Sequence, residues 1–120
     1  MIGLVVVSHS ADIARGIPQL LIQVAPDVPV TFAGGTSDGI GTSFEAILAA
    51  VEANSADELF AFYDLGSAKM NLDMANDMST KNLIIVDAPL VEGSYGAATL
   101  LQAEMPKEAI LAQLAPITFK

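Results

Sequence analysis

The chain contains no cysteine and a single histidine, His9, among its 120 residues. Without cysteine there is no disulfide bond, no thiolate nucleophile and no cysteine-ligated metal, a pattern that suits the cytoplasm. One imidazole, together with carboxylates that lack EF-hand-like spacing, makes a poor metal site, so we expect no metal. His9 is therefore the one residue that could act as an imidazole nucleophile.

Basic residues are also scarce, with five lysines and arginines against fourteen acidic residues and a net charge of −9. Nucleic-acid binding requires a basic stripe, so we expect no nucleic-acid partner, and the same charge disfavours anionic membranes. The N-terminus lacks the features of a signal peptide, and no apolar run approaches the ~20 residues that span a bilayer. We therefore expect a soluble cytoplasmic protein whose protein partners dock with basic faces.

Apolar residues, in contrast, are abundant: they make up 52% of the sequence, and charged residues only 16%. The usual charged share is about 25%, so the chain is suited to hiding apolar surface against a second copy of itself. Its length fits one domain, which we place at residues 1–120. We find no internal repeat, linker or low-complexity tract.

The pattern of apolar runs predicts an α/β fold. Short runs rich in β-branched or aromatic residues predict strands, and segments with helical spacing lie between them, so the order is βαβαβαβα with a further helix from Pro106. Pro29 cannot donate a ladder hydrogen bond and places the second strand at an edge. We predict a three-layer, doubly wound, mainly parallel sheet of order 2-1-3-4 with helices on both faces. The expected strands are 2–7, 28–32, 59–63 and 83–86, and the expected helices include 13–24, 44–51, 70–78 and 95–103.

This strand order brings His9 and Asp64 together, because they follow the neighbouring first and third strands at the point where ligands bind in such sheets. A carboxylate that accepts a hydrogen bond from one ring nitrogen fixes the tautomer and leaves a lone pair on the other nitrogen. The plainer alternative is a histidine that merely satisfies its hydrogen bonds at a strand end, and in an arbitrary protein that alternative is the more common.

Two loops around the expected site add evidence for an anion-binding function. The stretch GGTSDGIGTS is rich in glycine and hydroxyl groups, although Ile40 stands in place of the P-loop lysine and Phe44 in place of the third glycine of a dinucleotide motif. Thr42 and Glu45 match a capping box. In the other loop, LGSA, Ser67 is expected to cap a helix, so that two helix N-termini would face His9 and suit a phosphate.

A stripe of three methionines follows the second loop, at Met70, Met74 and Met78. Their spacing of four residues places them on one face of a helix. We interpret the stripe as core or as a contact between subunits of a dimer, because methionine stripes in helices usually fill cores.

The motifs VSHS, GGTSDGIGTS, YDLGSA and APLVEGSYGAA together resemble the phosphotransfer subunits of bacterial phosphoenolpyruvate-dependent dihydroxyacetone kinases, whose fold is that of the mannose-type IIA proteins. The resemblance covers residues 9–98. It implies a phosphotransferase in which His9 is phosphorylated and Asp64 orients it. Gly35, Thr36 and Ser67 fall in the corresponding site loops of that family. We also expect Ser10, as the cap of the first helix, and Ala68 to take part with them in binding phosphate or substrate.

The resemblance also implies the partners. His9 would accept a phosphoryl group, derived from phosphoenolpyruvate, from the histidine phosphocarrier protein, and would pass it to ADP bound on the nucleotide-binding kinase subunit. No cofactor would bind this chain directly, and a third subunit would hold dihydroxyacetone. Some relatives carry fused donor domains, for which this chain has no room, so we expect a separate donor. A homodimer is implied, and whether residues 116–120 exchange between its subunits is left open.

Three alternatives remain at this point. The chain could be the IIA component of a mannose-type sugar permease, or a non-catalytic oligomerisation or regulatory domain on the same fold. The third alternative, a small nucleotide-binding domain, is disfavoured by the missing P-loop lysine and the missing dinucleotide motif.

Overall fold

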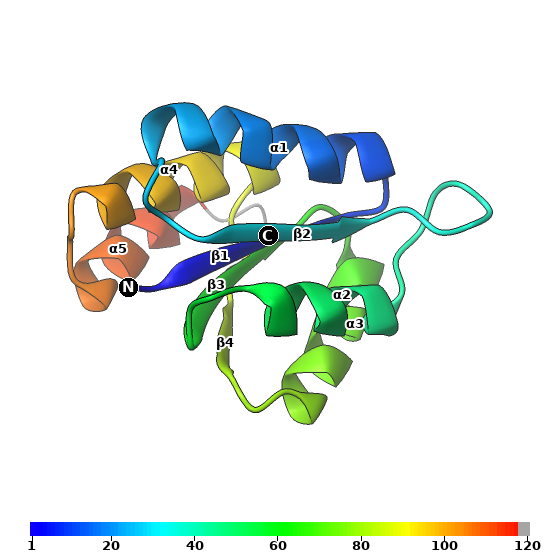
Figure 1. Cartoon of the computed structure of the whole chain (residues 1–120). Coiled ribbons are helices and arrows are strands. Elements are labelled where there is room, and N and C mark those ends of the chain that lie inside the picture. Colours follow the sequence, from blue (N-terminus) through cyan, green and yellow to red (C-terminus); the bar gives the residue numbers. More distant parts are fainter. Residues whose placement is uncertain (118–120) are drawn as a thin grey trace.

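The computed structural model describes residues 1–117. Residues 118–120, and with them most of the segment for which subunit exchange was considered, lie outside the described part of the chain. Four parallel strands form one sheet of order β2-β1-β3-β4, which confirms the predicted order, and helices lie on both sides of it (Figure 1). The elements are β1 (Gly3–Ser8), α1 (Ala11–Val24), β2 (Val30–Gly34), α2 (Phe44–Ala53), β3 (Glu58–Tyr63), α3 (Gly66–Met78), β4 (Asn82–Ile85), α4 (Leu90–Gln102), α5 (Lys107–Leu114) and a final 3₁₀ turn, Ala115–Ile117.

The order of the strands follows from their sequences. All six residues of β1 and five of the six in β3 are buried, as expected for central strands that helices cover on both faces. β2 begins one residue after Pro29, and the carbonyl of Pro29 accepts a hydrogen bond from the amide of Leu4 at 2.8 Å. Proline thus supplies the acceptor that the ladder needs, at a position where no donor is required.

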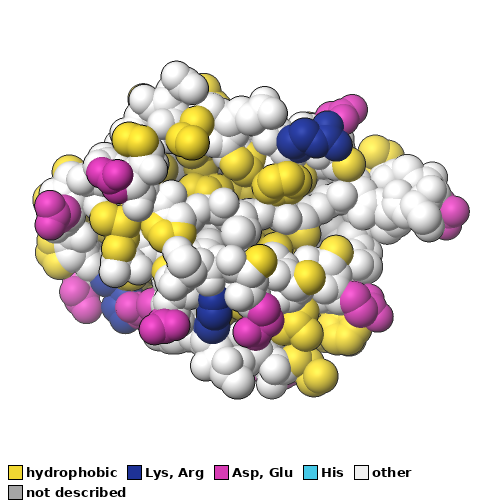
Figure 2. Space-filling model, viewed as in Figure 1, with side chains coloured by type: hydrophobic (Ala, Val, Ile, Leu, Met, Phe, Trp, Pro, Cys, Tyr) yellow, Lys and Arg dark blue, Asp and Glu magenta, His cyan; other side chains and the backbone are white. Residues whose placement is uncertain are grey.

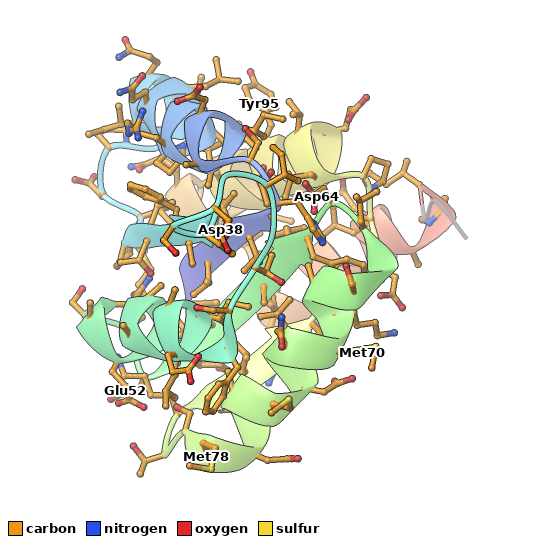
Figure 3. The ribbon with its side chains drawn as sticks, turned by 90° about the vertical axis from the view of Figure 1, so that its right-hand side faces the viewer. Asp38, Glu52, Asp64, Met70, Met78 and Tyr95 are labelled. Atoms are coloured by element: carbon orange, nitrogen blue, oxygen red, sulfur yellow. The ribbon has the colours of Figure 1, made fainter. Side chains whose placement is uncertain are left out.

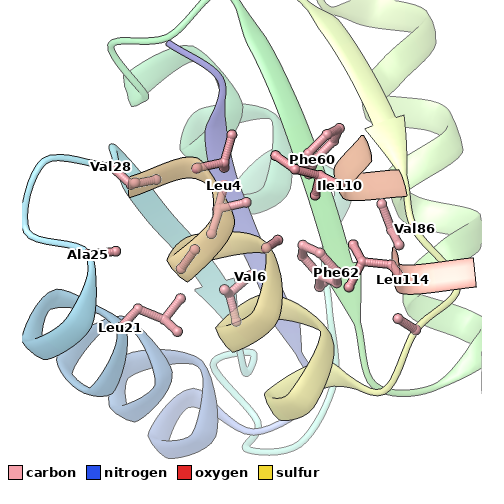
Figure 4. Packing of buried hydrophobic residues seen from close by; sticks show 14 of the residues in the cluster. Leu4, Val6, Leu21, Ala25, Val28, Phe60, Phe62, Val86, Ile110 and Leu114 are labelled. Carbon is pink, nitrogen blue, oxygen red and sulfur yellow. The ribbon is translucent and has the colours of Figure 1, made fainter. Parts of the chain in front are cut away.

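Two apolar cores lie on the two faces of the sheet. Alternate residues of β1 and β3 point to opposite sides, so Leu4 and Phe60 join one core and Val5 and Leu59 join the other. The first core is closed by α1, α4 and α5 (Figure 4), and the second by α2 and α3. These two cores fix both central strands, and with them the ends of the strands that carry the expected site.

Of the three helix caps predicted from the sequence, the structure confirms one and contradicts two. Ser10 caps α1 as expected, since its hydroxyl accepts a hydrogen bond from the amide of Ile13. The capping box of Thr42 was wrong: α2 begins at Phe44, so Ser43 holds the extended cap position and accepts from the amide of Ala46 at 3.1 Å.

Ser67 is not a cap either, because α3 begins at Gly66 and the cap position falls on Leu65, which has no capping side chain. The last α-helix, α5, begins at Lys107, with Pro106 as its cap residue and not its first helical residue.

The parallel register brings the ends of β1 and β3 to the same edge of the sheet. Val7 lies opposite Tyr63, so the residues that follow, from Ser8 on β1 and Asp64 on β3, leave the sheet side by side. No helix within residues 1–117 is long and apolar enough to cross a membrane.

Candidate functional site

His9 and Asp64 are in direct contact at the carboxyl edge of the sheet. Nδ1 of His9 lies 2.9 Å from Oδ1 of Asp64, and the two side chains are 14% and 23% exposed. Both residues directly follow the central strands, whose burial in two cores leaves little freedom at this point. Figure 3 shows Asp64 at the centre of this edge, between the loop that carries Asp38 and the start of α3.

Asp64 accepts four hydrogen bonds, which determine its protonation state. Oδ1 accepts from the His9 ring and from the amide of Leu65 at 2.7 Å, and Oδ2 accepts from the Ser8 hydroxyl at 2.7 Å and from the His9 amide at 3.0 Å. Burial alone would raise the pKa of this carboxyl, but the hydrogen bonds outweigh burial and lower its pKa below the ordinary value. Asp64 is therefore an ionised acceptor at neutral pH.

The ionised Asp64 fixes the tautomer of His9. A carboxylate can only accept, so in a neutral imidazole the proton lies on Nδ1, and Nε2 keeps its lone pair. The hydroxyl of Ser67 lies 2.5 Å from Nε2 and donates to that lone pair. Ser67 thus serves His9 directly and does not cap the helix, and Nε2 is the nitrogen available to an electrophile.

The glycine-rich loop 35–42 is tied to the same histidine. The amide of Gly41 donates to the His9 carbonyl at 2.8 Å, and Thr36 and Gly39 exchange two backbone hydrogen bonds that close the loop. Gly35 has a φ of +76°, and an added Cβ would meet Cβ of Ala11 at 2.8 Å. The loop therefore packs against the start of α1, next to His9.

The hydroxyl of Thr36 forms a hydrogen bond within the loop. Its Oγ1 accepts a hydrogen bond from the Asp38 amide at 3.3 Å, so it stabilises the loop. Ala68 buries its methyl group completely, and its amide donates to the Leu65 carbonyl at 3.0 Å. Within residues 1–117, no partner is assigned to the amides of Gly66 and Ser67 at the start of α3, and these are the amides that can meet an anion near Nε2.

Three further interactions beside the site were not predicted from the sequence. The Tyr63 hydroxyl donates to Asp87, and the ammonium of Lys69 lies 3.3 Å from the same carboxylate. Burial first, and then the bond to Asp87, raise the pKa of Tyr63 above its ordinary value. On the other side, Asn71 of α3 donates to the Thr42 hydroxyl at 2.7 Å and joins α3 to the glycine-rich loop.

These partners are far apart in the sequence, and a spacing motif therefore does not reveal them. Nor do residues 1–117 contain a cluster of three or more histidine, cysteine or acidic side chains that could hold a metal ion. The chemistry of the site therefore rests on the imidazole, the carboxylate, the Ser67 hydroxyl and the amides at the start of α3.

Comparison with known proteins gives matches over almost the whole chain. Residues 3–111 match the family model described as "PTS system fructose IIA component". A protein of Listeria innocua serovar 6a, named PEP-dependent dihydroxyacetone kinase 1, phosphoryl donor subunit DhaM, is 46% identical over 98% of this chain and 96% of its own length.

A second relative, from Lactococcus lactis subsp. lactis, is named PTS-dependent dihydroxyacetone kinase, phosphotransferase subunit DhaM. It is 49% identical over 93% of this chain and 92% of its own length. Among solved structures, that of EF1359, titled a protein of unknown function, has a TM-score of 0.83 at 31% identity and covers 98% of this chain and 95% of its own.

Proposed function

Because the chain belongs to the family of IIA components of the phosphotransferase system, and within it to the DhaM phosphoryl donor subunits, we propose that it carries a phosphoryl group on His9 between two protein partners. The donor is the histidine phosphocarrier protein, and the acceptor is ADP bound on the nucleotide-binding subunit of a dihydroxyacetone kinase. The observation that carries the proposal is the contact of Nδ1 with the ionised Asp64, which leaves Nε2 as the nucleophile.

In the first step, Nε2 of His9 attacks the phosphorus of the donor's phosphohistidine. The new nitrogen–phosphorus bond forms as the bond to the donor breaks, and the Ser67 hydroxyl turns from Nε2 to an oxygen of the incoming group. In the second step, a terminal oxygen of ADP attacks the same phosphorus, the bond to His9 breaks, and ATP forms on the partner subunit. The Nδ1 proton stays on His9, held by Asp64, throughout.

Positioning and hydrogen-bond donors supply most of what phosphoryl transfer requires. The free amides of Gly66 and Ser67 lie at the positive end of the α3 dipole, where they stabilise phosphoryl oxygens. Ser10 acts through the start of α1, which it caps, and Gly35 and Thr36 act by holding the loop against His9. Ala68 contributes through packing, since its amide is engaged. No bound cofactor takes part on this chain.

The proposed assembly includes a homodimer, as the resemblance implies. Within residues 1–117, β2 is an edge strand that pairs only with β1. A shallow groove of about 430 Å³ along it is lined by residues 30–32 and by four alanines of α2. Over this edge, Figure 2 shows hydrophobic and uncharged side chains, with charged side chains at the borders. Two copies of a chain with a net charge of −9 repel each other least across such a face, so it suits a second copy.

The test of the function is incubation with phosphoenolpyruvate, enzyme I and the phosphocarrier protein, followed by mass spectrometry and phosphorus NMR. We expect one acid-labile phosphoryl group per chain, attached at Nε2. It should be absent from His9→Ala and diminished in Asp64→Ala, since the second variant loses the group that fixes the tautomer. A phosphate that is stable to acid, or that lies on a serine, would refute the mechanism.

The acceptor is tested separately with the labelled phosphohistidine form. Transfer to ADP in the presence of the kinase subunit is the expected result. Transfer only to a sugar-specific permease domain would establish the permease alternative instead, and unchanged partner activity with His9→Ala would establish a non-catalytic domain.

A further inference from the structure

Three methionines form an exposed stripe on α3, where the sequence favoured a buried or intersubunit position. Met70, Met74 and Met78 are 70%, 50% and 65% exposed, so the interpretation as core was wrong. The buried side of α3 consists instead of Ala68, Leu72 and Ala75. Figure 3 shows Met70 and Met78 along α3 at the face of the molecule where Asp64 lies.

The stripe begins at the site itself. At 100° per residue, Ser67 and the three methionines fall within an arc of roughly 80° on the helix surface. The Ser67 hydroxyl, which contacts Nε2 of His9, is therefore the first member of a strip that continues along α3 for about 16 Å, at 1.5 Å per residue. A protein that presents a phosphoryl group to Nε2 must cover the start of this strip.

The chemistry of the strip indicates what covers it. Methionine is flexible and polarizable, and it is used at surfaces that accommodate a partner. The charged residues beside the strip on α3 are acidic, namely Asp73 and Asp77, both exposed. Lys69 lies on the same side but farther round the helix from the methionines, and it is paired with Asp87. The complementary surface is apolar with basic groups at its rim.

We propose that this methionine face, Met70, Met74 and Met78 with Asp73 and Asp77 beside it, is the docking surface for the phosphoryl donor protein, which meets it with an apolar patch rimmed by basic side chains. This inference rests on the proposed function, since it requires a protein donor for His9. The geometry reserves the N-terminal turn of α3 for the reacting groups and the three methionines for binding.

The test compares a protein donor with a small one. Phosphoramidate phosphorylates histidine without a docking surface, so it reports the reactivity of His9 alone. In Met70→Gln/Met74→Gln we expect kcat/KM for transfer from the phosphocarrier protein to fall about tenfold or more, as on loss of central apolar contacts, with an unchanged rate from phosphoramidate. Met70→Leu/Met74→Leu, which keeps the apolar surface, should retain transfer from the protein donor.

Two further variants sharpen the test. Leu20→Gln alters an equally exposed apolar residue on α1, 46% exposed, and should leave both rates unchanged. Asp73→Asn/Asp77→Asn should slow protein-dependent transfer at low ionic strength and weaken its dependence on salt, because these carboxylates attract the basic rim.

Several outcomes would overturn the proposal. Unchanged transfer from the protein donor in the glutamine variant would refute it, and so would an equal loss with both donors, which would place the effect on His9. A change in oligomeric state without a change in transfer would make the stripe a contact between copies. If neither donor phosphorylates the unaltered chain, the proposed function fails and the docking proposal fails with it.

Discussion

At the scale of single residues, the Asp64 carboxylate holds the site together through four hydrogen bonds. It accepts hydrogen bonds from the His9 ring, the His9 amide, the Ser8 hydroxyl and the Leu65 amide. An asparagine has one acceptor oxygen and one donor nitrogen, so it cannot replace a carboxylate that accepts on both oxygens. Asp64→Asn would therefore break part of the set and free the imidazole to adopt the other tautomer.

The lowered pKa of Asp64 gives a prediction for stability against pH. A carboxyl whose pKa is lower in the folded than in the unfolded chain stabilises the fold above its ordinary pKa of ~3.9, and this contribution is lost as pH falls through the folded-state value. We expect the free energy of unfolding of the unaltered chain to fall more steeply below about pH 4 than that of Asp64→Asn. Urea unfolding at a series of pH values measures both curves, and parallel curves would contradict the prediction.

The same substitution should slow phosphorylation of His9 at neutral pH, on the order of a hundredfold, because the reactive tautomer is no longer fixed. Phosphoramidate is the suitable donor here, since docking plays no part in that reaction. Retention of the full rate would mean that the tautomer is fixed by something other than Asp64.

At the scale of elements, the sequence specified the sheet better than the ends of the helices. Pro29 placed β2 at an edge, and the almost wholly apolar first and third runs placed β1 and β3 at the centre of the sheet. The meeting of His9 with Asp64 followed from that order. The start of α3 was not predictable from residue type, since Ser67 is a better cap than Leu65 in general. Its hydroxyl binds His9, and that partner comes from another element.

The methionine stripe shows a second limit of sequence patterns. A spacing of four residues indicates that side chains share one face of a helix, but the same spacing describes a face toward the core and a face toward a partner. In α3 the small residues Ala68 and Ala75, with Leu72, form the buried side. Only the packing of α3 against the sheet and α2 shows that the methionines lie outside.

The glycine-rich loop gives a prediction that distinguishes two glycines. Gly35 has φ +76° and an added Cβ would meet Ala11 at 2.8 Å, so Gly35→Ala should lower the free energy of unfolding by about 1–3 kcal/mol. Gly16 lies in the middle of α1 with nothing within 4 Å of an added Cβ, and Gly16→Ala should raise it by about 0.5–1 kcal/mol. Thermal or urea unfolding measures both, and shifts of the same sign would contradict the argument.

At the scale of the whole molecule, the free edge of β2 is the place where the proposed second copy could pair. In a parallel ladder, every second residue of a strand directs its backbone N–H and C=O groups toward the same neighbour. The Pro29 carbonyl accepts from the Leu4 amide and so points toward β1. The backbone groups of Val30, Phe32 and Gly34 therefore point away from β1. Within residues 1–117 these outward groups have no hydrogen-bond partner. If β2 of a second copy paired with this edge in the antiparallel direction, about a two-fold axis at Phe32, the outward backbone groups of all three residues on each strand would find hydrogen-bond partners.

If two copies pair through β2, one charged side chain introduced on this strand should dissociate the dimer. Phe32 is 44% exposed on the free edge, and a lysine on an edge strand is a known means of preventing strand pairing. We expect light scattering to give a dimer for the unaltered chain and a monomer for Phe32→Lys, whereas Leu20→Lys on α1 stays dimeric. The amides of Val30 and Phe32 should exchange hydrogen faster in the monomer. Because His9, Asp64 and Ser67 belong to one chain, phosphoramidate should label the monomer at the same rate, and a dimer that survives Phe32→Lys would exclude β2 as its interface.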